Sequence, residues 1–109
     1  MSQQPRHVVN EARFSIEKMQ KVNLFETGNF FCDVYGLEPG QEQKVHSHAG
    51  ADKVYMVLNG TGTFTIGDES HELGPLQAIC APAGSPHGVA NSSQQRLSVL
   101  VFMTPNPNS

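Results

Sequence analysis

Three histidines in this chain have the spacing expected of metal ligands. His46 and His48 stand two residues apart, and His87 follows in a separate run at residues 82–91. On a β-strand, residues i and i+2 point to the same face, so His46 and His48 can offer two imidazoles to one point. A third imidazole from a neighbouring strand would complete one face of a coordination sphere. Such a set suits a divalent first-row transition metal, and the sequence leaves Fe, Mn, Ni, Zn and Cu open.

The elements that must position these histidines are expected to be short β-strands. Runs rich in aromatic and β-branched residues alternate with turn dipeptides such as Asn59-Gly60. The expected strands cover residues 30–37, 44–48, 53–58, 61–66, 71–73, 77–81 and 96–103. Segment 11–26 is ambiguous between a short strand and a helical turn, and a rigid loop at 82–86 is expected to deliver His87. Many short strands without a convincing helix predict a β-sandwich or a β-barrel.

The residues around His46 and His48 form a longer pattern. Gly40 is followed by five residues and then by His46, Ser47 and His48, and Gly60 follows further along. This arrangement fits the pattern G-x5-H-x-H-x3,4-E-x6-G at every position except the glutamate.

A second pattern surrounds His87. Pro82, Gly84, His87 and Asn91 are spaced as in G-x5-P-x-G-x2-H-x3-N, and Leu76 stands in the place of the leading glycine. In this order, the two patterns resemble the two motifs of the cupin superfamily, and the likeness covers about residues 31–102. The chain is similar to small single-domain cupins of the cupin 2 conserved-barrel type.

The resemblance implies an all-β double-stranded β-helix, or jelly-roll barrel, with His46, His48 and His87 as metal ligands. It also implies a metal-dependent enzyme of the dioxygenase, isomerase or decarboxylase type, acting on a small polar molecule. Some cupin dioxygenases are described as working with three histidines alone. Two alternatives stay open: a non-catalytic barrel that binds a metal or a small molecule, and a vestigial barrel that serves as a structural dimer.

The cupin motif has a glutamate among its ligands, and its place is disturbed here. Counting back from Gly60, or four residues forward from His48, the position is Lys53, whereas the shorter spacing reaches Asp52. Adjacent strand residues face opposite sides, so only one of the two is expected to point inward. We favour Lys53, because residues 54–58 continue the strand register, and keep Asp52 as an alternative ligand. An ammonium beside a dication is unfavourable, so weak or partial metal occupancy is expected.

No nucleophile or phosphate-binding motif competes with this site. Lys53 and Tyr55 share one face of the expected strand and are the candidates for a catalytic proton donor or acceptor, although Tyr55 is equally well read as core. His7 and His71 are interpreted as surface residues, and Asn91 as a turn residue. No cofactor besides the metal is expected.

The chain length of 109 residues suits one domain. Residues 1–12 are expected to form a flexible N-terminal tail, and residues 13–105 the barrel. A barrel this small, with apolar strands near Phe30 and Leu100, is expected to pair as a homodimer.

Charge and composition limit the partners. The net charge is −3 and no basic cluster is present, which argues against nucleic acid. No apolar run has the length of a membrane span or the pattern of a signal peptide, so no membrane partner and a cytoplasmic location are expected. Cys32 and Cys80 are then interpreted as reduced, buried thiols.

Overall fold

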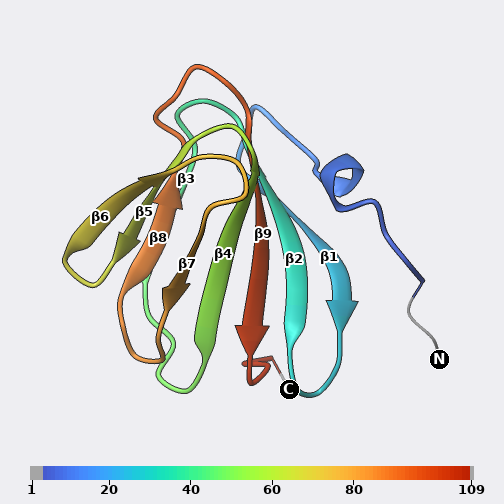
Figure 1. Cartoon of the computed structure of the whole chain (residues 1–109), viewed down its shortest axis with the longest axis vertical. Coiled ribbons are helices and arrows are strands. Elements are labelled where there is room, and N and C mark those ends of the chain that lie inside the picture. The colour runs from blue at the N-terminus through green and yellow to red at the C-terminus, as the bar shows by residue number, and fades with distance from the viewer. Residues whose placement is uncertain (1–3, 109) are drawn as a thin grey trace.

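Two antiparallel sheets pack face to face in the structure, a computed structural model that describes residues 4–108 (Figure 1). Within that range the strands are β1 (Gln20–Glu26), β2 (Phe31–Leu37), β3 (Glu42–His46), β4 (Asp52–Asn59), β5 (Gly62–Ile66), β6 (Glu69–Leu73), β7 (Ala78–Ala81), β8 (His87–Ala90) and β9 (Leu97–Thr104). One sheet has the order β1-β2-β9-β4-β7, and the other has the order β3-β8-β5-β6. The predicted all-β jelly-roll class is therefore confirmed.

The observed strands overlap the expected ranges and differ mainly at their ends. The histidine strand, β3, begins at Glu42 and ends at His46, so His48 lies in the following loop rather than on the strand. The loop expected to deliver His87 gives way to a short strand, β8, that starts at this residue. The ambiguous segment 11–26 contains β1.

The main core lies between the sheets and is built by side-chain alternation. On β4, Lys53, Tyr55 and Val57 are buried, whereas Asp52 is exposed. The ring of Tyr55 meets that of Phe64 from the opposite sheet, with 5.1 Å between centroids. Burial of apolar surface stabilises the fold by roughly 25 cal/mol per Å², which favours the register in which Tyr55 and Val57 face inward. The register that buries Tyr55 and Val57 therefore also turns Lys53 into the barrel.

The hairpin from β4 to β5 holds that register. It turns at Asn59-Gly60, as the dipeptide predicts. Gly60 has a φ of 86°, and a Cβ at this position would collide with the carbonyl oxygen of Arg96. The turn therefore requires glycine for its backbone conformation and for the close approach of the chain leading into β9.

The segment before β1 lies against the face of β1 and β2 that points away from the main core. It includes a single 3-10 turn at Val8–Glu11, and Val8 and Ala12 pack against a small buried cluster on that face. Arg6 Nη1 donates a hydrogen bond to the carbonyl oxygen of Leu24 at 3.1 Å. Residues 1–3 lie outside the described part of the chain, and the flexibility expected for residues 1–12 stays a prediction.

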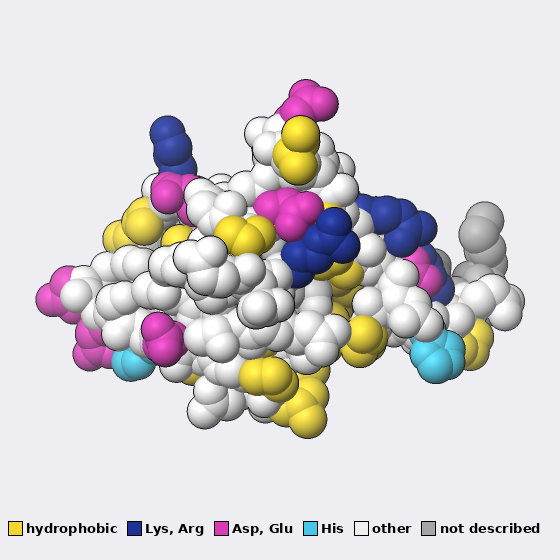
Figure 2. All heavy atoms as spheres, turned by 90° about the horizontal axis from the view of Figure 1, so that it is seen from above, with side chains coloured by type: hydrophobic (Ala, Val, Ile, Leu, Met, Phe, Trp, Pro, Cys, Tyr) yellow, Lys and Arg dark blue, Asp and Glu magenta, His cyan; other side chains and the backbone are white. Residues whose placement is uncertain are grey.

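The surface mixes charges of both signs. Figure 2 shows acidic, basic and hydrophobic side chains interspersed on the face seen from above. Both cysteines are free, but Cys80 is exposed and Cys32 half-buried, so the expectation that both are buried was wrong. No helix within residues 4–108 has the length and apolar character needed to cross a membrane.

Candidate metal centre

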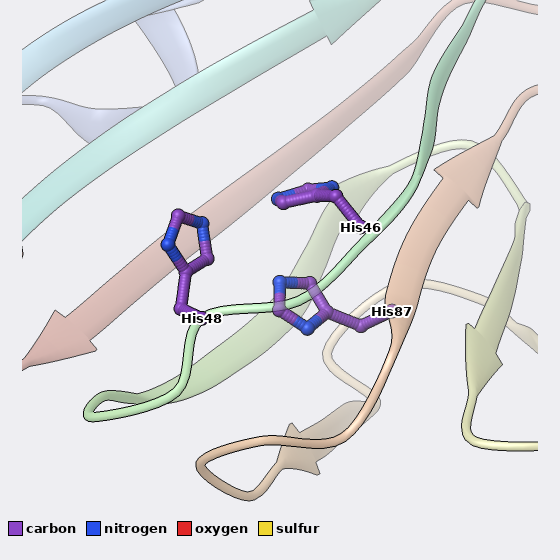
Figure 3. A group of neighbouring side chains, drawn as sticks. All are labelled: His46, His48 and His87. Carbon is purple, nitrogen blue, oxygen red and sulfur yellow. The ribbon is translucent and has the colours of Figure 1, made fainter.

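Pairing between β3 and β8 brings the candidate ligands together. His46, the last residue of β3, is the register partner of His87, the first residue of β8. His48 follows two residues later, in the loop toward β4. The three rings turn toward a common space (Figure 3), and one nitrogen from each lies within 4.8 Å of the other two. This group of residues can hold a metal ion.

Backbone carbonyls select which nitrogen two of the rings present. His46 Nδ1 lies 2.8 Å from the carbonyl oxygen of Lys44, and His87 Nδ1 lies 3.0 Å from that of Ser85. A carbonyl only accepts hydrogen bonds, so each Nδ1 carries the proton and each Nε2 keeps a lone pair. Metal-binding histidines are commonly oriented in this way.

His87 shows the fit most directly. Its side chain is buried, and its Nε2 has no hydrogen-bond partner among the described residues. A buried polar atom without a partner is uncommon in folded proteins and requires an explanation. A metal ion shared with His46 and His48 would provide the missing interaction.

Burial favours the neutral, metal-binding form of two of the rings, those of His48 and His87. Burial lowers the pKa of His87 to about 4, and the hydrogen bond to Ser85 opposes that shift only in part. Burial, followed by the charges of His46 and Lys53, also lowers the pKa of His48. Only the neutral ring ligates a metal. Proton competition at His87 therefore begins at more acidic pH than the ordinary histidine value of about 6.5 would imply.

The structure places Lys53 and Asp52 on opposite sides of β4. The Lys53 side chain points into the barrel and is only 1% exposed. Asp52 is exposed, and its Oδ1 accepts a hydrogen bond from the backbone N–H of Ala83 at 2.8 Å. The position expected for the glutamate therefore carries a cation, and the carboxylate of Asp52 is outside the histidine cluster.

The ammonium of Lys53 lies among polar and aromatic groups. Its Nζ donates a hydrogen bond to Oε1 of Gln43 at 3.2 Å, and it lies 5.4 Å from the ring centre of Tyr35 and 5.0 Å from that of Tyr55. Burial, followed by the charge of Lys21, lowers the pKa of Lys53 to about 8. Lys53 is therefore mostly protonated at neutral pH.

A cavity of about 230 Å³ connects Lys53 to His46 and His48, whereas His87 is not among its lining residues. It is lined by Lys21, Phe31, Asp33, Tyr35, Gln43, His46, His48, Lys53, Met103, Pro107 and Asn108. Its volume is below the roughly 300–1,000 Å³ of pockets for drug-sized ligands. Any molecule that it encloses must therefore be small.

The match to known proteins fits this geometry. A family model described as "Cupin domain" matches residues 33–103. The chain belongs to the cupin family. A Thermus thermophilus protein of known crystal structure is 43% identical in sequence to this cupin. The two structures match with a TM-score of 0.92 over 94% of this chain and 98% of the other. A Klebsiella pneumoniae protein with a double-stranded β-helix domain has a TM-score of 0.89 at 21% identity, over 99% and 95% of the two chains. An uncharacterised Streptomyces coelicolor protein is 29% identical over 77 residues, which are 71% of this chain and 72% of its own.

Two motif positions in this cupin have structural roles. Asn91 is buried, and its Nδ2 donates to the carbonyl oxygens of Leu37 and Gln95 at 3.0 and 2.7 Å. Leu76 stands where the second cupin motif is expected to begin with glycine, and its φ is 66°, in the left-handed region that glycine adopts without strain. The backbone therefore keeps the turn despite the substitution.

The residues of β2 that line the cavity were not predicted from the sequence. Asp33 and Tyr35 line the cavity, and Gln43 Nε2 donates to the hydroxyl of Tyr35 at 3.4 Å. The alternation of side chains along β2 indicates which of its residues share a face. Nothing in the sequence alone, however, places this strand next to the histidine cluster. Tyr55 is fully buried, and its hydroxyl has no partner among residues 4–108.

Replacing Lys53 by methionine is expected to stabilise the metal-free protein at pH 7. The folded pKa of about 8 lies below the ordinary value of 10.5, so between these values the unfolded chain binds more protons and wild-type stability rises with pH. Below pH 8 the folded protein bears the full cost of burying the ammonium, about 3 kcal/mol at most. Urea unfolding should show a gain of about 1–3 kcal/mol at pH 7 that shrinks as the pH approaches 10.5. A gain that does not vary with pH would contradict this account.

Proposed function

We propose that this protein is a metal-dependent cupin enzyme acting on a small polar molecule, with His46, His48 and His87 as the metal ligands. The observation that carries the proposal is the convergence of three imidazoles, two of which line a small cavity, while the Nε2 of the third, His87, is buried and has no hydrogen-bond partner within residues 4–108. The chemistry supplied by a divalent ion there is Lewis-acid polarisation of substrate oxygens. Reactions of the dioxygenase, isomerase or decarboxylase type all fit such a site.

The remaining residues bind the substrate and handle protons. Lys53, with a pKa of about 8, can hold or release a proton near neutral pH, which is the range required of a general acid or base. Gln43 orients the ammonium of Lys53 by accepting a hydrogen bond from it at Oε1. The apolar side chains of Phe31 and Met103 line the same cavity and limit the space for water. The ring face of Tyr55 makes a cation–π contact with the ammonium of Lys53 and so stabilises its charge.

The test combines metal analysis with turnover. The protein is purified without a metal-affinity tag, its metal content is measured by mass spectrometry, and the loaded protein is assayed on a panel of diketones, thiols and sugar derivatives. Metal binding that saturates at close to one ion per chain when the ion is added, together with turnover of one class, supports the proposal. Metal without turnover supports a binding barrel, and the absence of any metal affinity supports a vestigial barrel.

We also propose that the protein is a homodimer joined through the outer face of the five-stranded sheet. Val54 and Phe102 are register partners on that face, 37% and 36% exposed, and the ring of Phe30 stacks on that of Phe102. Adjacent exposed apolar side chains on a sheet favour association. Light scattering at tens of micromolar should give twice the monomer mass. Phe102→Glu should yield monomers, whereas Ile16→Glu, at a position that is 90% exposed, should not. A wild-type monomer would refute the proposal.

A further inference from the structure

Lys53 is a buried cation that forms no ion pair among residues 4–108, and the carboxylate of Asp33, which lines the same cavity, acts on it only at longer range. The ion pairs found within residues 4–108 are Arg6–Glu11, His71–Glu69 and Arg96–Glu38, and none includes Lys53. Its ammonium has three hydrogens, and Gln43 is its hydrogen-bond acceptor. Buried charges in proteins are normally paired, because removing an ion from water costs several kcal/mol. An unpaired ammonium that lines a cavity therefore indicates that the cavity receives an anion.

The charges around the cavity support the same conclusion. Two ammonium groups, those of Lys21 and Lys53, line it together with one carboxylate, that of Asp33. Asp33 already accepts a hydrogen bond from Nδ2 of Asn23 at 2.8 Å, and burial raises its pKa. The lining is therefore net positive even before a metal ion adds its charge.

The rest of the lining is suited to a carbon skeleton. Phe31, Met103 and Pro107 line the same cavity as the polar groups. An inorganic anion would leave these apolar walls without contacts, whereas a short organic acid would cover them. The volume of about 230 Å³ restricts the acid to a small one.

We infer that the cavity binds a small organic carboxylate, with Lys53 as the residue that pairs with its charge. As a statement about substrate, the inference rests on the proposed function. The substrate would then bring the negative charge that a cupin glutamate otherwise contributes from the protein. His46, His48 and Lys53 line one cavity, so a bound carboxylate lies beside the proposed metal ligands. Lys53 selects acids over neutral molecules of the same shape.

The test uses propionate and propionamide, which share a shape and differ in charge. Binding to the metal-free protein at pH 7 is followed by NMR chemical-shift titration. Propionate should bind wild type with perturbations around Lys53 and Gln43, and propionamide should bind at least tenfold more weakly. Lys53→Met should weaken propionate binding at least tenfold. Lys18→Met, which removes an exposed lysine that does not line the cavity, should leave it unchanged.

Several results would overturn the inference. They are equal binding of the two probes, undiminished propionate binding by Lys53→Met, and no propionate binding by wild type at 50 mM. If Lys53→Met does not fold, Lys53→Arg takes its place and must retain propionate binding. Metal content is measured separately on the same preparations. Propionate binding without metal affinity would leave the inference standing and reject the proposed metal enzyme, and metal affinity without propionate binding would do the reverse.

Discussion

Replacing Lys53 by glutamate is expected to tighten metal binding at least tenfold, which corresponds to about 1.4 kcal/mol. The side chain of Lys53 points into the barrel and shares a cavity with His46 and His48. The change removes a cation that repels a dication and adds a carboxylate that can coordinate it. Competition titration against a chelator, using Zn²⁺ or Co²⁺ at pH 7, measures the difference. The Co²⁺ spectrum additionally reports whether an oxygen ligand has been added.

Two control variants separate charge from position in this experiment. Lys53→Met should tighten binding less than Lys53→Glu does, because it removes repulsion without adding a ligand. Asp52→Asn should change the affinity little, because the carboxylate of Asp52 is exposed and hydrogen-bonded to the backbone of Ala83. If Asp52→Asn abolished metal binding while Lys53→Glu had no effect, the aspartate would be the fourth ligand.

Removing one histidine of the cluster is expected to reduce metal affinity by two orders of magnitude or more. With three protein ligands, His46→Ala or His87→Ala leaves only two nitrogens for the metal. Metal analysis after dialysis should then fall from the wild-type level to background. His71→Ala is the matched control, because His71 pairs with Glu69 on the surface and lies outside the cluster.

Folding must be checked in these variants, since His87 is buried and its truncation leaves a cavity. His46 is only half-buried, so His46→Ala keeps the experiment decisive if His87→Ala unfolds. Wild-type metal content in folded His46→Ala would mean that there is no metal site at this cluster.

The fold and the histidine cluster could be predicted from the sequence, because both depend on local sequence patterns. Motif spacing and strand periodicity concern residues close together in the chain, and the Asn59-Gly60 turn specifies its own hairpin. The choice between Lys53 and Asp52 follows from the same alternation: the apolar positions Tyr55 and Val57 determine which of the two faces inward.

The cavity walls were not within reach, because they depend on how distant strands stack. Asp33 and Tyr35 become neighbours of the histidines only when the two sheets close on each other. The absence of an ion pair to the Lys53 ammonium among residues 4–108 is likewise a property of the whole packed interior. Leu76 is a local feature that the sequence did not predict, because a leucine side chain gives no indication of the left-handed backbone that this residue adopts.

The hydrogen bonds to the ring Nδ1 atoms of His46 and His87 bear on how this site tolerates mutation. Both acceptors are main-chain carbonyls, at Lys44 and Ser85, two residues before the ring that each one orients. Every amino acid carries that carbonyl, so substitutions at positions 44 and 85 that preserve the backbone path leave the tautomers unchanged. Evolution can therefore vary these neighbours to adjust surface charge or solubility while the nitrogens offered to a metal stay the same.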